Sequence, residues 1–310
     1  MSEYIFTVKQ PTSEDDYQGY HQLRFQQLRQ PWGQPKGSEV DELENQSVHR
    51  MVVDQCGNVV AVGRFHKTSC FVAQIRFMAV SDKYQGQGLG KMILNALEHE
   101  AAVQGVKTIE LNAREVALNF YKACDYQLHD EAHTLYSEVK HFAMSKTLQP
   151  INNQFTPWLA ELEGVWHSTI PVSKHMLIHP ASLVNKQFTV CANREANINL
   201  HNTMFAGSIY TLATLTGWGW VHLLVKQQQL QGDIVLADAD IRYKQPLHGQ
   251  PLAKVQQEFT SGSVEVLGKG RRARIQVKVD VCDGDTVVAT FNGKYVVLPP
   301  AKPVQQGKES

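Results

Sequence analysis

The first half of the chain alternates between two spacings of hydrophobic residues. Short apolar runs typical of buried strands are separated by segments in which apolar residues recur every three or four positions, as in helices. The pattern predicts strands at 5–8, 50–53, 59–66, 71–80 and 108–111. It predicts helices at 15–30, 91–104 and 117–123. Strands that alternate with helices are typical of an α/β domain.

The second half has a different pattern, in which one long apolar helix at 204–226 precedes a series of strands. A shorter helix is predicted near 157–164. The strands are predicted at 233–243, 253–259, 271–281 and 286–298, with a hairpin turn at Asp283-Gly284-Asp285. One helix and a run of antiparallel strands predict an α+β domain, with a curved antiparallel sheet around a central helix.

Polar residues and a proline interrupt both patterns at 148–154, which we expect to be a linker. The predicted domains are therefore 1–147 and 155–300, and the polar tail at 301–310 is expected to be disordered. A chain of 310 residues is long enough for two domains of about 150 residues each.

The charge balance excludes several classes of partner. Lys plus Arg equals Asp plus Glu at 30 each, so no overall field attracts nucleic acid or an anionic membrane. Residues 196–225 carry no formal charge, but Gly217, Gly219 and several asparagines interrupt the apolar run, so we expect no membrane span. The five cysteines form no CxxC pair, which favours reduced thiols in a cytoplasmic protein, and we expect no metal site.

A glycine-rich loop at Gln85-Gly86-Gln87-Gly88-Leu89-Gly90, followed by Lys91, lies between a predicted strand and a predicted helix. Its backbone N–H groups, together with the start of the helix, suit the oxygens of a pyrophosphate. The loop lacks the Lys-Ser/Thr pair of nucleotide-binding P-loops. The sequence therefore predicts a phosphate-binding loop of another kind.

The segment around this loop resembles the GNAT acetyltransferase family, whose acyl-CoA loop reads Q/R-x-x-G-x-G/A. Gln85, Gly88 and Gly90 match that pattern, and Asn112 and Tyr121 match a later motif. The resemblance covers about residues 1–147 and implies an acetyl-CoA site. It implies that backbone groups at 77–80, including Met78 and Val80, bind pantetheine. It also implies that Tyr121 protonates the departing CoA thiolate.

The acceptor for such an acetyl transfer is not evident from the sequence. The strand at 71–80 holds no carboxylate that could deprotonate an amine. Glu110 and Glu115 are possible substitutes, and the rigid loop at 31–35 could line an acceptor site. A domain that binds acetyl-CoA without turnover is a further alternative.

A second constellation lies at 199–207, where Asn199 and Gly207 flank the start of the long helix. The segment resembles the hot-dog thioesterase pattern N-x-x-G-x-x-H-G-G, with Asn202, Phe205 and Ala206 in place of a glycine, the histidine and a glycine. The resemblance covers about residues 155–298. It implies a GNAT fold joined to a hot-dog fold, which usually forms a homodimer.

This loop could hold a thioester carbonyl between the Asn199 amide and the Gly207 N–H as an oxyanion hole. Hydrolysis also needs an activated water, yet residues 208–225 hold no Asp or Glu, and only Asp238 or Asp240 could reach the site, from the sheet or from a partner subunit. Decarboxylation of a malonyl thioester needs no base. It needs an apolar pocket, and the candidates for its walls are Met204, Phe205 and Tyr210. It also needs a proton donor, for which His201, Thr203 and water are candidates. Asn202 is either a turn residue or a catalytic amide.

The fusion of both patterns resembles the bacterial YiiD-type proteins. That resemblance implies a malonyl-acyl-carrier-protein or malonyl-CoA decarboxylase that forms acetyl thioesters to initiate fatty acid synthesis. The alternative is a bifunctional N-acetyltransferase and acyl thioesterase. A basic run could bind the phosphates of CoA or an acidic acyl carrier protein: Lys269, Arg271, Arg272, Arg274 and Lys278.

Overall fold

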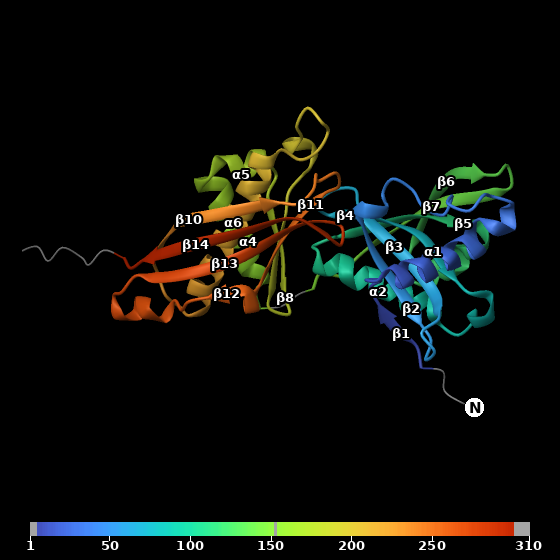
Figure 1. The fold of residues 1–310 in the computed structure, drawn as a ribbon, viewed down its shortest axis with the longest axis horizontal. Coiled ribbons are helices and arrows are strands. Elements are labelled where there is room, and N and C mark those ends of the chain that lie inside the picture. The colour runs from blue at the N-terminus through green and yellow to red at the C-terminus, as the bar shows by residue number, and fades with distance from the viewer. Residues whose placement is uncertain (1–4, 152–153, 301–310) are drawn as a thin grey trace, which may run out of the picture.

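The computed structural model describes residues 5–151 and 154–300 and contains two sheets that lie side by side along its longest axis (Figure 1). Each sheet has its own hydrophobic core. The chain therefore has two domains. The predicted tail at 301–310 and part of the predicted linker lie outside the described residues.

The first sheet has the order β1-β2-β3-β4-β5-β7-β6, in which only β4 and β5 pair in parallel. Its strands are β1 (Thr7–Lys9), β2 (Ser47–Val53), β3 (Val59–Lys67), β4 (Val72–Val80), β5 (Thr108–Arg114), β6 (Gln127–Leu135) and β7 (Val139–Thr147). The helices are α1 (Glu14–Leu28), α2 (Leu89–Val103) and α3 (Leu118–Lys122). Every strand and helix predicted in this half is present, but β6 and β7 were not predicted. An edge strand such as β6, with almost all of its residues exposed, gives no hydrophobic alternation.

Helices α1 and α2 pack against different apolar clusters of this sheet. Leu89, Ile93 and Leu97 of α2 belong to the larger core, whereas Tyr20 and Leu23 of α1 belong to a second cluster. Alternate residues of a strand point to opposite faces, so the two helices cover opposite faces of the sheet. The segment that follows α1 and the glycine loop that precedes α2 therefore approach the sheet from different sides.

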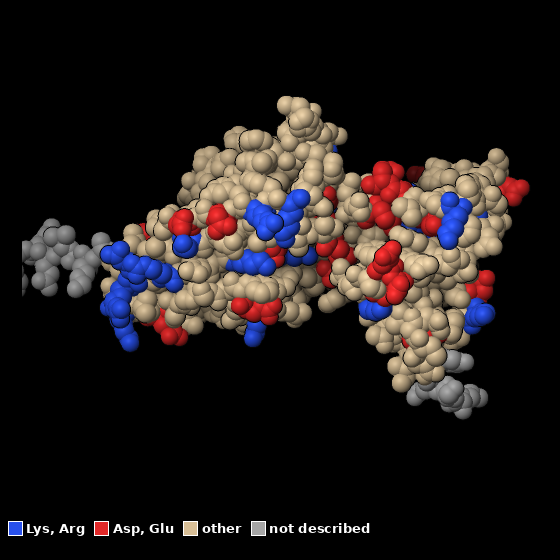
Figure 2. Space-filling view, in the orientation of Figure 1, with Lys and Arg blue, Asp and Glu red and all other residues tan. Residues whose placement is uncertain are grey.

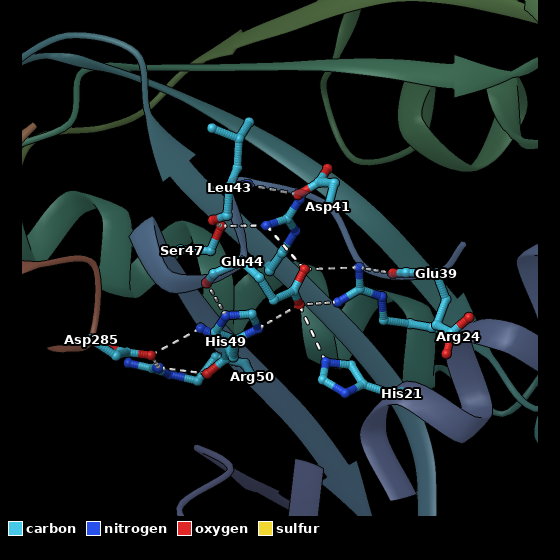
Figure 3. A network of polar contacts seen from close by, with 11 residues as sticks. His21, Arg24, Glu39, Asp41, Leu43, Glu44, Ser47, His49, Arg50 and Asp285 are labelled. Atoms are coloured by element: carbon cyan, nitrogen blue, oxygen red, sulfur yellow. Dashed lines mark hydrogen bonds and ion pairs between the residues drawn. The ribbon is translucent and has the colours of Figure 1, made fainter. Parts of the chain in front are cut away.

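A network of buried charges stabilises the α1 side of the sheet (Figure 3). The side chains of Arg24 and Arg64 are fully buried. The carboxylate of Glu44 lies between them, with its Oε2 3.3 Å from an Arg64 nitrogen and 3.2 Å from an Arg24 nitrogen. Asp41 also pairs with Arg64. Because each buried guanidinium has a carboxylate partner, the positive charges of the two arginines are neutralised inside the protein.

The second sheet has the order β10-β14-β13-β11-β9-β8, with the short β12 on β13. Its strands are β8 (His179–Val184), β9 (Gln187–Cys191), β10 (Asp233–Tyr243), β11 (Pro251–Gln256), β12 (Thr260–Ser261), β13 (Ala273–Asp283) and β14 (Thr286–Leu298). The helices are α4 (Thr156–Thr169), α5 (Pro171–His175) and α6 (Ala206–Gln227). The strands at β10, β11, β13 and β14 match the prediction, whereas the hairpin β8–β9 was not predicted.

The long helix α6 lies in the concave side of this sheet, as the hot-dog fold requires (Figure 1). Two glycines let it pack closely, because a Cβ at Gly217 would lie 2.4 Å from the Tyr295 hydroxyl and one at Gly219 would lie 2.6 Å from the Trp166 ring. The uncharged stretch of the sequence is thus explained by burial inside a domain. Among the described residues, no helix is both long and apolar enough to cross a bilayer.

The two domains contact each other through the turn between β13 and β14. Asp285 in this turn accepts a hydrogen bond of 3.0 Å from the backbone N–H of His49 and lies 3.6 Å from an Arg50 nitrogen. A small apolar cluster of Cys70, Cys191 and Leu252 adds to the contact. Polar and apolar groups of both domains are therefore buried together.

We expect Glu44→Gln to lower the free energy of unfolding by about 3–5 kcal/mol, because it leaves two buried guanidinium groups without their shared carboxylate. Urea denaturation of the full chain measures this change. The matched control is Glu42→Gln at an exposed position of the same loop, which should stay within about 0.5 kcal/mol of the wild type. A Glu44→Gln variant as stable as the control would contradict the assignment.

We also expect stability to fall between pH 6.5 and pH 4. Burial lowers the pKa of His49 and of His66 from 6.5 to about 4. In that window the unfolded chain binds protons that the native state excludes, so the stability present above pH 6.5 is lost as the pH approaches 4. The gap in unfolding free energy between the wild type and His66→Gln should narrow as the pH falls from 6.5 to 4. A gap that is independent of pH would refute this role of His66.

Candidate active sites

The first candidate site is a cavity where β4 and β5 separate. The two strands pair in register only as far as Ile75 and Leu111. Directly after this point Phe77 has a φ of 54°, and the register with β3 shifts. Over residues 76–80 the edge of β4 that faces β5 has no strand partner among the described residues. A cavity of about 550 Å³ opens there.

Four of the ten residues predicted to bind acetyl-CoA line this cavity together with Tyr121, whereas residues 86–91 of the glycine loop do not. Met78, Val80, Gln85, Asn112 and Tyr121 are all part of its wall. The unpaired edge of β4 presents backbone N–H and C=O groups to the cavity, as the amides of a pantetheine arm require. The predicted pantetheine segment at 77–80 thus lies where a strand partner would otherwise be.

The glycine loop ends at the start of α2. Gly86 and Gly88 have φ angles of 74° and 83°, and a Cβ on either would contact nothing, so it is the backbone conformation that favours glycine. At Gly90 the reason is space, since a Cβ would lie 3.2 Å from the Phe120 ring. Helix α2 has no side-chain cap, so the first N–H groups at Leu89–Lys91 remain open for an anion.

Tyr121, the predicted acid, is buried in the wall of the cavity. Its hydroxyl donates to the Met78 sulfur at 3.6 Å, and its ring packs edge-on against Phe120 at 5.0 Å. Burial raises the pKa of Tyr121, so the phenol carries its proton at neutral pH. Glu110 and Glu115, the suggested bases, are exposed and do not line the cavity, because Glu110 lies where β4 and β5 are still paired and Glu115 follows the end of β5.

The sequence prediction missed the other end of the cavity, which is basic. Arg29, Arg114, His133 and His141 line it together with Arg76. They come from the end of α1, the end of β5 and the hairpin β6–β7. Because that hairpin was not predicted, no signal in the sequence brought these residues together.

The second candidate site is the loop before α6. Asn199 Oδ1 accepts hydrogen bonds from the backbone N–H of His201 at 2.9 Å and of Thr203 at 3.3 Å. Asn199 Nδ2 donates to Thr203 Oγ1 at 3.0 Å. Asn202 has a φ of 57° and accepts a bond of 2.9 Å from Arg194 on its Oδ1. The structure therefore brings Asn199, His201, Asn202 and Thr203 together in one turn.

Gly207 lies beyond this turn, in the first residues of α6. The helix has no side-chain cap, so the N–H groups of its first turn are free to bind an oxyanion. A Cβ at Gly207 would lie 2.4 Å from the Phe205 ring, which explains the glycine. The described hydrogen bonds do not join Asn199 to Gly207, and the Asn199 carboxamide keeps one N–H group that could be donated to a ligand.

The acidic residues of β10 point away from α6. Asp238 pairs with Lys294 at 2.6 Å, and Asp240 accepts a bond of 3.1 Å from Asn292. The alternate residues of β10, such as Ile241, pack on the core that contains α6. On α6 itself, Thr214 has a buried hydroxyl without a partner among the described residues. Within one subunit, neither aspartate reaches the loop before α6.

One group of side chains could hold a metal ion. The ligand atoms of Glu163, His167 and His179 lie within 4.8 Å of one another. Glu163 Oε1 is 2.8 Å from His179 Nδ1, so the cluster is also held by its own hydrogen bond. His175 and His179 are four positions apart, as on one face of a helix. In the structure His175 ends α5 and His179 begins β8, so the two do not lie on one helix.

A further cavity of about 820 Å³ lies at the junction of the domains. Arg50, Glu100 and Lys254 are part of its wall, and Arg50 pairs with Glu100 at 2.8 Å. None of the predicted site residues line it, and its charges of opposite sign balance. It therefore contains none of the groups expected to bind acetyl-CoA or a thioester.

Comparison with known proteins gives separate matches for the two domains. The family model "Acetyltransferase (GNAT) family" matches residues 14–126, and "Putative thioesterase (yiiD_Cterm)" matches residues 159–299. "Uncharacterized N-acetyltransferase YjcF" from Bacillus subtilis is 33% identical over 36% of this chain and 79% of its own length.

Two solved structures are each similar to about half of the chain. A "putative thioesterase from Shewanella oneidensis" is 46% identical over 46% of this chain and 99% of its own length, with a TM-score of 0.44. An aminoglycoside 6'-N-acetyltransferase complexed with coenzyme A is 15% identical over 48% of this chain and 99% of its own, with a TM-score of 0.41.

Proposed function

The chain belongs to the GNAT acetyltransferase family in its first domain and to the yiiD_Cterm thioesterase family in its second, and we propose that the second domain decarboxylates malonyl thioesters while the first binds acetyl-CoA. One observation carries the first part of this proposal. The uncapped start of α6 offers N–H groups for an oxyanion, yet the carboxylates of β10 that could activate water point away.

The proposed reaction begins with the thioester oxygen of the malonyl group at the N–H groups of the first turn of α6 and at the Asn199 amide. The bond between Cα and the carboxylate breaks, carbon dioxide leaves, and the electron pair forms a thioester enolate whose oxygen these donors stabilise. Cα then takes a proton from His201, Thr203 or water, which yields the acetyl thioester. Buried Met204 and half-buried Tyr210 disfavour the ionised carboxylate of the substrate.

Acetyl-CoA binding in the first domain follows from the cavity between β4 and β5. The pantetheine arm would pair with the free edge of β4, and the pyrophosphate would lie on the N–H groups at 86–91. Tyr121 would protonate the thiolate when an acetyl group is transferred. The coenzyme would therefore enter from the side of α2.

An acidic acyl carrier protein fits the far end of the second domain. Figure 2 shows a dense group of Lys and Arg there, and in Figure 1 this is the end where the 3₁₀ turn Glu265–Lys269 meets β13. Ala273 and Ile275 are buried, while Arg272 and Arg274, which alternate with them along the chain, are exposed. Lys278 of the basic run pairs with Asp280 at 3.3 Å, but the four cations at 269–274 have no carboxylate partner among the described residues. Such a group of cations attracts a negatively charged protein surface.

A second copy of the chain would complete the site of the second domain. Ile198, Leu200 and Phe205, which flank the proposed oxyanion loop, are 46%, 89% and 55% exposed. A homodimer that covers these apolar side chains would also exclude water from the malonyl carboxylate.

A thioesterase is the second candidate, and the match of residues 159–299 to the family model "Putative thioesterase (yiiD_Cterm)" favours it. Hydrolysis would release free malonate or free fatty acid, whereas decarboxylation releases carbon dioxide and keeps the thioester. The products therefore distinguish the two reactions.

We expect the wild type to convert malonyl-carrier protein or malonyl-CoA into the acetyl thioester, and Asn199→Ala to lower kcat by about 10²- to 10³-fold because one oxyanion donor is lost. Carbon dioxide release and the mass of the acyl product measure this. Asn199→Asp keeps the oxygen that accepts from His201 and Thr203 but loses the amide donor, so it should fail as well. Asn292→Ala, on the outer face of β14, is the matched control. Free malonate as the product would refute decarboxylation.

We expect the double variant Arg271→Gln, Arg272→Gln to raise KM for malonyl-carrier protein about fivefold at low salt, with little change in kcat. The difference should shrink as ionic strength rises, because surface charges are then screened. Steady-state kinetics at two salt concentrations measures it, with the exposed Lys174→Gln as control. An equal KM for the double variant and the control would exclude this surface as the carrier site.

A further inference from the structure

The basic end of the first cavity lies on the side of the sheet opposite the glycine loop. Arg29 follows directly after α1, whereas the glycine loop starts α2, and these helices cover opposite faces. A coenzyme held at the glycine loop therefore leaves the basic end open to a second reactant. Gln85, at the start of the glycine loop, and the basic end line one cavity of about 550 Å³, so a coenzyme that extends from the loop along β4 would meet the second reactant inside it.

Two guanidinium groups converge at this end without a carboxylate. Arg29 donates to the carbonyl oxygen of Leu28 at 3.2 Å, and Arg114 donates to the same oxygen at 3.3 Å. Arg114 is mostly buried, and burial followed by the charge of Arg29 lowers its pKa. No Asp or Glu lines the cavity, and among the described residues neither arginine is part of a salt bridge.

This arrangement contrasts with the neighbouring arginines. Arg24 and Arg64 are neutralised by Glu44 and Asp41, and Arg76 of the same cavity pairs with Asp41 at 3.1 Å. Two like charges that share one carbonyl repel each other at a cost that an anion between them would remove. The missing carboxylate is therefore one that a ligand would supply.

A base lies beside the two arginines. His141 on β7 is 8% exposed and lines the cavity. Its Nδ1 lies 3.0 Å from the carbonyl oxygen of Val139, so Nδ1–H donates and the lone pair is on Nε2. The groups that face His141 are this carbonyl, the stacked ring of His133 at 4.7 Å, and the cations Arg114 and Arg29. Burial, together with these cations, lowers the pKa of His141 and keeps the ring neutral.

We propose that the first domain acetylates a small primary amine that also carries a carboxylate or a phosphate, with Arg29 and Arg114 binding the anionic group and His141 accepting the amine proton. This proposal rests on the proposed acetyl-CoA site at the glycine loop. It adds the missing base and the chemical class of the acceptor.

The step balances as follows. His141 Nε2 takes one proton from the ammonium group, and the free amine attacks the thioester carbonyl carbon. The N–C bond forms, the C–S bond breaks, and the sulfur takes the proton of the Tyr121 hydroxyl. The second proton lost by the nitrogen restores Tyr121, and His141 releases its proton to solvent. The products are the N-acetyl acceptor and free CoA.

The test uses the full chain with acetyl-CoA and matched pairs of amines, in which one member is anionic. The pairs are phosphoethanolamine with ethanolamine, γ-aminobutyrate with butylamine, and glutamate with glutaminamide, in which both carboxylates are replaced by amides. Release of CoA and the mass of the N-acetyl product are measured. We expect kcat/KM for an anionic amine to exceed that of its neutral partner at least tenfold, with the phosphate and carboxylate pairs showing which group is preferred.

Three variants separate the roles. Arg114→Gln and Arg29→Gln should each raise KM for the anionic amine at least tenfold and leave the Kd of acetyl-CoA within twofold. His141→Gln should lower kcat by about 10²-fold and remove the acidic limb of the pH profile. Lys140→Gln, exposed on the same strand as His141, is the control for loss of a positive charge. Unfolding midpoints show whether each variant is folded.

Equal use of neutral and anionic amines would overturn the proposal, and so would an Arg114→Gln effect confined to the Kd of acetyl-CoA. Acetyl-CoA that binds but is transferred to none of these amines would also overturn it, while leaving the coenzyme site intact. Acetyl-CoA that does not bind at all would refute the proposed function of this domain instead.

Discussion

The hydrogen bonding between β4 and β5 stops partway along the two strands, and the cavity of the first domain depends on this stop. Up to Ile75 and Leu111 the two strands form an ordinary parallel ladder. The left-handed backbone at Phe77 then turns β4 out of register, and both strands keep unsatisfied backbone groups. Buried polar backbone requires partners, so a ligand bound between the strands would supply them. The coenzyme arm and the acceptor would approach this opening from its two faces.

The second domain depends on how closely α6 fits the sheet. Gly217 and Gly219 leave no room for a side chain, and the Tyr295 hydroxyl donates to the Thr214 carbonyl at 2.8 Å. This packing fixes the start of the helix and, with it, the N–H groups beside Gly207. One side of α6 is buried, while Ser208, Thr211 and Thr214 are half-buried polar positions outside that core. The start of the helix is therefore held by apolar packing and not by a charged group.

Much of this architecture could be predicted from the sequence, because the helices α2 and α6 and the strands from β10 to β14 have clear periodicity. The hairpins β6–β7 and β8–β9 could not, since β6 is nearly all exposed and β8 contains a histidine, a proline and a serine. The glycine loop, Met78 and Tyr121 were within reach of motif analysis. Arg29, Arg114 and His141 were not, because only the folded sheet brings the ends of α1, β5 and β7 to one cavity.

The turn that carries Asp285 gives the molecule a mechanical property. Because it is buried against His49 and Arg50, and Cys70 packs on Cys191 and Leu252, rotation of one half relative to the other would strip both of shared contacts. These contacts oppose rotation of one half relative to the other. An acyl group passed from one proposed site to the other would therefore travel on a diffusing carrier while these contacts are kept.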